Sequence, residues 1–112
     1  MYGEVVLTDQ KGEPKTVPML ANAATLIRFK QLFHCDLMNG IISKEGNFDI
    51  DMVSKLAFVM TKQAAKADMK TLSMDQFIEW IEDFESMTFL ENCNQIFAIY
   101  FNSKENSSEA KK

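Results

Sequence analysis

The 112-residue sequence lacks most of the short motifs that mark enzymes and metal-binding proteins. It contains neither a glycine-rich phosphate-binding loop nor an H-E-x-x-H zinc motif. Its single histidine, His34, and its two cysteines, Cys35 and Cys93, do not have the spacing of metal ligands. We therefore expect no catalytic residue, no metal ion and no cofactor.

His34 and Cys35 are the one pair that could serve as a base and a nucleophile. Adjacent residues of a helix point about 100° apart, however, so this arrangement is unfavourable. We interpret His34 as a helix-terminal residue that the helix dipole favours. The cysteines are expected to be reduced thiols in the core, with a disulfide between them as the alternative.

Long apolar runs are also missing. No segment approaches the roughly 20 apolar residues needed to span a bilayer. The N-terminus does not show a basic region followed by an apolar stretch, so we expect no signal peptide and a cytoplasmic protein. Hydrophobic residues nevertheless make up 46% of the chain and aromatic residues 11%, which is enough for one core and one domain over residues 1–102.

Basic residues are outnumbered, with 12 lysines and arginines against 16 acidic residues and a net charge of −4. A general nucleic-acid-binding protein would be basic, so nucleic acid is not an expected partner. No lysine or arginine lies between Lys70 and Lys104. This stretch is either a solvated acidic face on two helices or a surface that attracts a basic partner. Its carboxylates are Asp75, Glu79, Glu82, Asp83, Glu85 and Glu91.

Both prolines, Pro14 and Pro18, lie near the N-terminus, where the pattern predicts a β-hairpin over residues 4–19. The strands Val5–Thr8 and Thr16–Met19 are apolar and β-branched, and the residues between them favour a turn. Pro18 lacks an N–H group, which predicts an edge strand or the end of a strand. Because an isolated hairpin is only marginally stable, it must pack on the helices or pair with another chain.

The rest of the chain predicts about four helices, so the expected fold is mainly α after a short hairpin. The first helix begins near Asn22, and Asp36 is expected to cap a further turn over residues 36–42. A loop over residues 43–47 follows, and Asp49 is a good N-cap for the second helix. The predicted apolar faces are Ala24, Ile27, Leu32 and Phe33 in the first helix, and Val53, Leu56, Ala57, Met60 and Ala64 in the second.

Two capping boxes predict the starts of the last two helices. Ser73 and Gln76 precede the apolar residues of 77–84. Thr88 and Glu91 stand at the start of the very apolar stretch 89–101. Residues 103–112 are polar and are expected to form a disordered tail.

A faint likeness to calcium-binding EF-hands does not survive alignment. Placing Gly46 at the glycine that the calcium loop requires puts Ile41 at the first aspartate position. It also puts Met52 at the position of the bidentate glutamate. The strongest calcium ligands are missing, so no calcium site is expected.

Methionine is frequent, with eight residues. Most are expected to fill the core, but methionine also forms surfaces that bind apolar helices without strict sequence demands. Some apolar surface is expected to stay exposed, which would serve a protein partner or self-association. The candidate partner-binding residues are Asp75, Glu79, Glu82, Asp83, Glu85, Met60, Met74 and Met87.

Three stretches of the sequence carry a resemblance to a known family. The second and third are Leu56–Ala64 and Phe77–Glu85. The first carries Val17 and Pro18, Ala24 and Thr25, Arg28 and Phe29, Phe33, and Asp36 and Leu37. Together these stretches resemble the tail assembly chaperones of long-tailed phages and prophages of Gram-positive bacteria, and the second and third are similar to helical signatures of that family. The pair His34 and Cys35 departs from the pattern, which has a glycine or a small polar residue near this point.

The resemblance implies a protein without catalytic residues that binds the tape measure protein. That client is long, largely helical and apolar in places, and would aggregate before the tail tube forms around it. The chaperone keeps it soluble and then yields to the tail tube protein. Modest affinity for each copy would allow this displacement, and repetition along one client supplies avidity.

The resemblance also implies a longer product made by a ribosomal frameshift near the end of the gene. Residues Ala110, Lys111 and Lys112 can be encoded by GCA AAA AAG, which contains the slippery sequence A AAA AAG. The polar tail would then link to a second domain that brings the client to the tail tube protein.

Two other functions stay open from the sequence. One is a small acidic helical adaptor or regulator that binds one folded bacterial partner. Stoichiometry discriminates the two binding functions, since the chaperone would bind in many copies to one client. An enzyme ranks third because no convergent set of polar residues is present.

Overall fold

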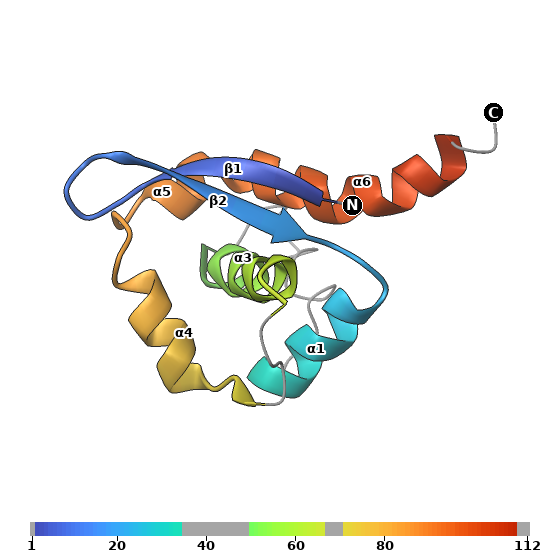
Figure 1. The fold of residues 1–112 in the computed structure, drawn as a ribbon, viewed down its shortest axis with the longest axis horizontal. Helices are drawn as coiled ribbons and strands as arrows, with labels where there is room; N and C mark the ends of the chain where they lie inside the picture. Colours follow the sequence, from blue (N-terminus) through green and yellow to red (C-terminus); the bar gives the residue numbers. More distant parts are fainter. Residues whose placement is uncertain (1, 35–49, 67–70, 110–112) are drawn as a thin grey trace.

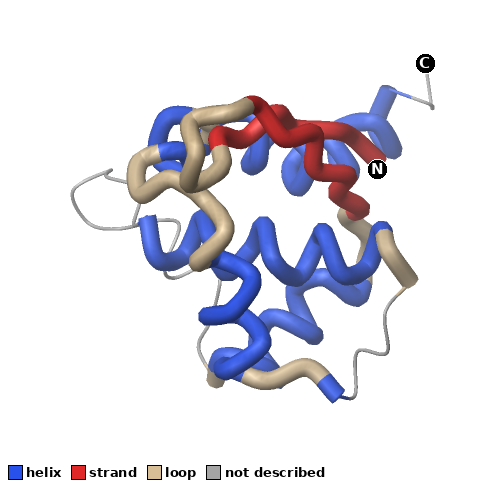
Figure 2. The backbone as a smooth tube through the Cα atoms, turned by 60° about the vertical axis from the view of Figure 1, so that its left-hand side comes forward, coloured by secondary structure: helices blue, strands red, loops and turns tan. Residues whose placement is uncertain are grey.

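The computed structural model describes residues 2–34, 50–66 and 71–109, with side chains described up to Phe101 except those of residues 50 and 51. The predicted class is confirmed: helices follow an N-terminal antiparallel hairpin (Figure 1). The hairpin lies on one side of the central helix α3, and α1 lies on the other (Figures 1 and 2). The elements are β1 (Tyr2–Thr8), β2 (Pro14–Leu20), α1 (Ala24–Phe33), α3 (Ile50–Ala64), α4 (Met74–Ile81), α5 (Thr88–Glu91) and α6 (Cys93–Glu109).

The hairpin has the expected turn and is longer than predicted at both ends. Val5 pairs with Val17, and the Asp9 carboxylate accepts hydrogen bonds from the N–H groups of Lys11 and Glu13, both at 2.9 Å. Gly12 has φ 83°, a left-handed conformation that glycine adopts without strain. The strand side chains that face the helices form part of the core: Val5, Leu7, Val17 and Met19.

Pro18 lies inside β2 rather than at its end, opposite Glu4. Both strands of a two-stranded sheet are edge strands, the positions at which a proline is tolerated within a sheet. The start of the hairpin turn is also held by the segment after α4. The N–H of Gln10 donates to the carbonyl of Asp83 at 3.1 Å, and the N–H of Glu85 donates to the carbonyl of Thr8 at 2.9 Å.

Helix α3 is buried around its circumference between Met52 and Met60, where Lys55 alone is half-buried. The predicted stripe is in the core from Val53 to Met60, and Phe58 and Val59 on other faces are also fully buried. An apolar surface around the whole circumference is typical of a central helix. The helix therefore packs against the hairpin on one side and against α1 and α4 on the others.

Aromatic rings connect these elements into one core. Phe58 of α3 contacts Phe77 at 5.4 Å and Trp80 at 5.5 Å between ring centroids. Phe33 of α1 contacts Phe77 at 5.2 Å, and Trp80 contacts Phe89 of α5 at 5.6 Å. Most of these pairs are tilted or edge-to-face, the geometries that aromatic rings prefer.

The buried face of α1 differs from the prediction. Ile27, predicted to face the core, is 59% exposed, whereas Thr25 and Phe29 are fully buried. The Thr25 hydroxyl oxygen holds the residue inside by accepting hydrogen bonds from the Asn22 N–H and from Nε2 of Gln63. These polar contacts fix the rotation of α1 about its axis. The predicted face is confirmed for Phe33, which is buried, and wrong for Ile27.

The predicted fourth helix is two helices, α5 and α6, separated at Asn92. Its predicted capping box is wrong, because the hydroxyl of the fully buried Thr88 accepts a hydrogen bond from the N–H of Thr8 at 2.8 Å. Helix α6 continues to Glu109, past the predicted boundary at residue 102, and the sequence there has no glycine or proline to end it.

Several predictions fall outside the described residues. These are the position of Cys35, the turn over residues 36–42, the cap at Asp49, and residues 110–112 of the tail. Cys93 is a free, half-buried thiol. His34 ends α1 as predicted, in a left-handed conformation with φ 57°.

Candidate protein-binding surface

Helix α4 carries the candidate surface, and local chemistry explains its start and orientation. The Ser73 hydroxyl caps the helix by accepting a hydrogen bond from the N–H of Gln76 at 3.3 Å, as the capping box predicts. Asp75 lies in the first turn, where the helix dipole favours a negative charge. Phe77 and Trp80 pack toward α3, so the opposite side of α4 faces outward.

Two apolar side chains stand on the outward side of α4. Met74 and Ile78 are four residues apart and therefore lie one above the other on the helix surface. Each is 44% exposed. We call these two residues the α4 ridge. The core is complete without them, so their exposed parts are apolar surface available for contact.

Three carboxylates run beside the ridge. Asp75, Glu79 and Glu82 are exposed and have the i, i+4, i+7 spacing that places them on one face. We call them the acidic stripe. Within the described part of the chain, none of the three forms an ion pair with a lysine or arginine. The stripe is thus a row of carboxylates without a direct ion pair among the described residues, and Lys62 lines a hollow beside Glu79.

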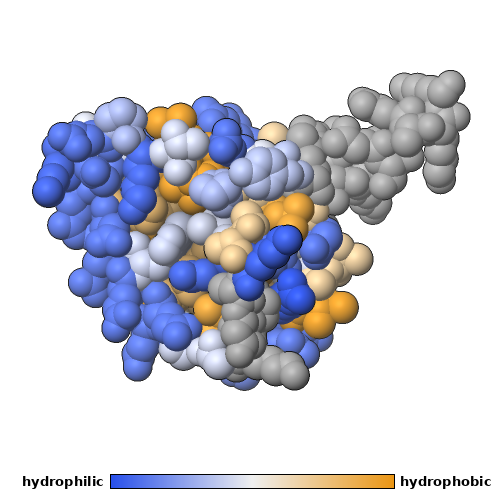
Figure 3. All heavy atoms as spheres, viewed as in Figure 1, coloured by the Kyte–Doolittle hydropathy of each residue, from blue (hydrophilic) through white to orange (hydrophobic). Residues whose placement is uncertain are grey.

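Hydrophilic side chains dominate the side of the molecule where α4 and the hairpin turn lie (Figure 3). Asp83 is exposed and, with Glu79, lines a shallow hollow that also includes Lys62 and Trp80. The structure therefore brings four of the predicted acidic residues close together: Asp75, Glu79, Glu82 and Asp83.

Glu85 was predicted to belong to the partner-binding surface, but the structure gives it another role. Its side chain is half-buried, and the Oε1 atom accepts hydrogen bonds from the N–H of Met87 at 3.0 Å and the hydroxyl of Ser86 at 3.3 Å. Glu85 therefore orders the turn before α5. A residue whose carboxylate is used in this way is a structural residue.

The predicted methionines divide between core and surface. Met60 is fully buried in α3, so its assignment to a partner-binding surface is wrong. The helical spacing of Met60 with Val53, Leu56 and Ala57 already predicts that it faces the core. Met74 and Met87 are exposed, at 44% and 46%. Ile78 and Leu90 are also exposed, beside Met74 and Met87, and the sequence pattern does not identify them because apolar side chains of an amphipathic helix are expected to face inward.

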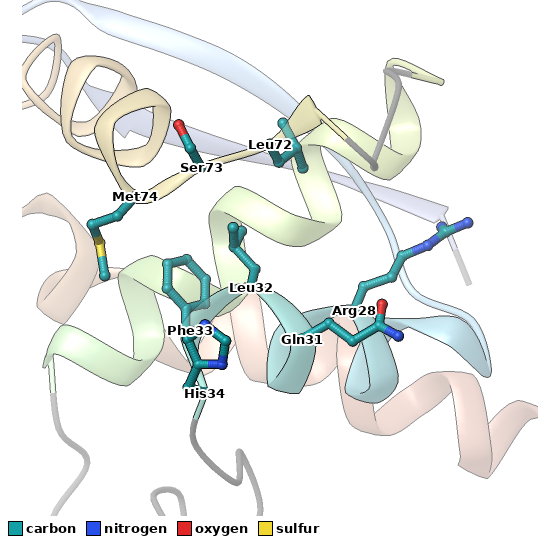
Figure 4. A pocket seen from close by; sticks show the side chains of 8 residues that line it. All are labelled: Arg28, Gln31, Leu32, Phe33, His34, Leu72, Ser73 and Met74. Atoms are coloured by element: carbon teal, nitrogen blue, oxygen red, sulfur yellow. The ribbon is translucent and has the colours of Figure 1, made fainter.

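A cleft of about 790 Å³ lies next to the ridge, between the end of α1 and the start of α4. Leu32, Phe33 and Leu72 give it apolar walls, and Met74 of the ridge lies on its border. Figure 4 shows side chains from the end of α1 facing those of Leu72–Met74. The polar groups at its margin are Arg28, Gln31, His34 and Ser73.

The described residues contain no group of three or more histidine, cysteine or acidic side chains that could hold a metal ion. Among the helices of the described residues, none has the length and apolar character to cross a membrane. Comparison of the chain with protein families, with characterised proteins and with solved structures found no match.

Proposed function

We propose that this protein is a non-enzymatic phage tail assembly chaperone that binds the tape measure protein in the host cytoplasm and keeps it soluble before tail tube polymerisation. The observation that carries the proposal is the α4 surface, where exposed Met74 and Ile78 stand beside an acidic stripe that forms no ion pair with the described residues. A long helical client presents apolar stripes flanked by charge, and this surface is complementary to such a segment.

The size of the exposed apolar surface supports transient binding. The exposed large apolar side chains are spread over several elements of the described chain, with at most two on each: Tyr2 and Val6 on β1, Ile27 on α1, Met74 and Ile78 on α4, and Met87 and Leu90 at α5. Small contacts give modest affinity for each copy, which allows displacement by the tail tube protein. Many copies along one client would together shield it from aggregation.

The resemblance to tail assembly chaperones supports the same proposal through residues of the fold. Val17, Phe29 and Phe33 of the first similar stretch are buried, so they act in the core. His34 lies near the point at which the family has a glycine or small polar residue, and its left-handed backbone is the conformation that glycine favours.

Charge reversal on α4 tests the proposal. The triple variant Glu79→Lys, Glu82→Lys and Asp83→Lys should fold normally, because all three side chains are exposed, and should bind the tape measure protein more weakly. The measurement is the fraction of tape measure protein that stays soluble on co-expression, with circular dichroism as the folding control.

Unchanged solubility of the tape measure protein with this variant would show that the acidic residues of α4 do not contribute to its binding. If the wild-type protein leaves the tape measure protein insoluble, the chaperone function itself is wrong. Native mass spectrometry of the soluble complex should show many copies of this protein for each client.

The cleft between α1 and α4 favours a second candidate, the adaptor that binds one folded partner. A concave site with apolar walls of Leu32, Phe33 and Leu72 suits a single inserted side chain. A one-to-one complex with a globular partner, lost on substitution of Leu72 by aspartate, would support the adaptor over the chaperone.

A further inference from the structure

We infer that the segment that docks on α4 is a basic amphipathic helix, with apolar side chains on the α4 ridge and lysine or arginine beside the acidic stripe. The inference rests on the proposed function, because that function makes the docked segment part of a helical client. It goes further by assigning the charge pattern of the segment and the residues that recognise it.

The ridge sets the apolar half of the recognition. Met74 and Ile78 are one helical turn apart, so they match apolar residues at i and i+4 or i and i+3 of a facing helix. Met74 also borders the cleft that Leu72 and Phe33 line. One end of the docked helix can therefore insert a large apolar side chain, and the flexible methionine tolerates variation in that side chain.

The stripe sets the charged half. Asp75, Glu79 and Glu82 run parallel to the ridge at one-turn intervals, and none of them forms an ion pair with a described residue. Lys62, which lines a hollow beside Glu79, is a nearby cation that leaves the three carboxylates in excess. Lysine or arginine at the same intervals on the docked helix would meet these carboxylates at the solvent-exposed rim of the contact. Such rim charges select partners and speed their association, and salt weakens them.

The same charge pattern excludes other occupants. An acidic helix would be repelled by the stripe, as would a nucleic acid. A second copy of the chain docking through its own α4 would bring two acidic stripes together, so this face is not suited to a symmetric dimer. The remaining occupant of suitable chemistry is the basic amphipathic helix.

Three synthetic peptides test the inference against the full chain. Each has about 18 residues and the same leucine stripe, and the flanking positions are all lysine, all glutamine or all glutamate. Fluorescence anisotropy at low salt should show the lysine peptide binding about tenfold more tightly than the glutamate peptide, with the glutamine peptide between them. Raising the salt concentration to 1 M should remove most of this preference.

Two variants and one control make the test specific. Glu79→Lys with Glu82→Lys should reverse the preference toward the glutamate peptide, and Ile78→Ser should weaken binding of all three peptides. The control, Glu4→Lys with Glu13→Lys, makes the same change in net charge at exposed residues of the hairpin and should keep the wild-type preference.

Equal binding of the three peptides, or an equal effect of the control variant, would overturn the inference. If the tape measure protein is kept soluble but the peptides are not discriminated, the inference fails and the chaperone function stands. If the peptides are discriminated but the tape measure protein still aggregates, the docking inference stands and the proposed function fails.

Discussion

At the scale of single residues, Gln63 joins three elements of the fold. Its Nε2 atom donates to the carbonyl of Leu20 at 2.7 Å and to the hydroxyl of Thr25 at 2.8 Å. Its Oε1 atom accepts a hydrogen bond from Arg28 at 3.0 Å. A buried amide with all these partners holds the end of β2 and the start of α1 against α3.

Replacing Gln63 by leucine should lower the free energy of unfolding by about 2 kcal/mol, because the Leu20 carbonyl loses its hydrogen bond inside the protein. Urea unfolding followed by the fluorescence of Trp80, the single tryptophan, measures this change. Gln95→Leu is the matched control at an exposed position of α6. An equal effect of the two substitutions would show that the buried network does not stabilise the fold.

The conformation of His34 gives a second prediction. A residue other than glycine is strained at the φ of 57° that His34 adopts. The N–H of His34 donates a hydrogen bond to the carbonyl of Lys30 at the end of the helix. His34→Gly should therefore stabilise the protein by about 0.5–1 kcal/mol. His34→Ala, which keeps the strain, should not. Thermal unfolding of both variants is the measurement, and a loss of stability in the glycine variant would contradict this explanation.

At the scale of elements, the junction of β1 and α5 depends on Thr88. The hydroxyl accepts from the Thr8 N–H, and the Asn92 side chain donates to the Thr88 carbonyl at 2.9 Å. The short helix α5 is thereby fixed to the end of the hairpin before α6 begins. Thr88, which the sequence predicts to cap a helix, therefore connects β1 to α5 instead.

Thr88→Val keeps the volume of the side chain but leaves the Thr8 N–H without this partner. We expect a loss of about 1–2 kcal/mol and faster hydrogen exchange at the Thr8 amide. Thr88→Ser keeps the hydroxyl and should preserve the slow exchange. Slow exchange of the Thr8 amide in the valine variant would show that another group protects it.

At the scale of the whole molecule, the aromatic rings join elements that are distant in sequence. Trp80 is at the centre of this cluster, with Phe58 on one side and Phe84 and Phe89 on the other. Its half-buried ring therefore connects α3, α4 and α5. The outward α4 surface is held in place by this inward side of the same helix.

Trp80→Ala should destabilise the whole domain by about 3 kcal/mol, since it opens a cavity among three other rings. Circular dichroism during urea unfolding is the measurement because the variant has no tryptophan. Ile78→Ala, on the exposed side of α4, should change stability much less. Similar losses in the two variants would mean that the ring cluster contributes little beyond apolar area.

The sequence by itself determined the hairpin, the apolar stripe of α3 and the start of α4, because the forces that form them are local. The hairpin turn, the Ser73 cap and the central stripe of α3 depend on residues within a few positions of one another. The excess of acidic residues between Lys70 and Lys104 was also visible in the sequence. Whether these carboxylates share a face, and that Ile78 stands exposed beside them, was not.

Only the tertiary structure decided which faces are buried and which polar side chains are structural. The rotation of α1 depends on Gln63, which is 38 residues from Thr25, and the role of Thr88 depends on Thr8, which is 80 residues away. Met60 and Met74 are the same residue type. Met60 is buried because α3 lies at the centre of the fold, whereas Met74 is exposed because it stands on the outward side of α4. Contacts between distant residues decide these outcomes, because burial and hydrogen bonding depend on what the fold brings together.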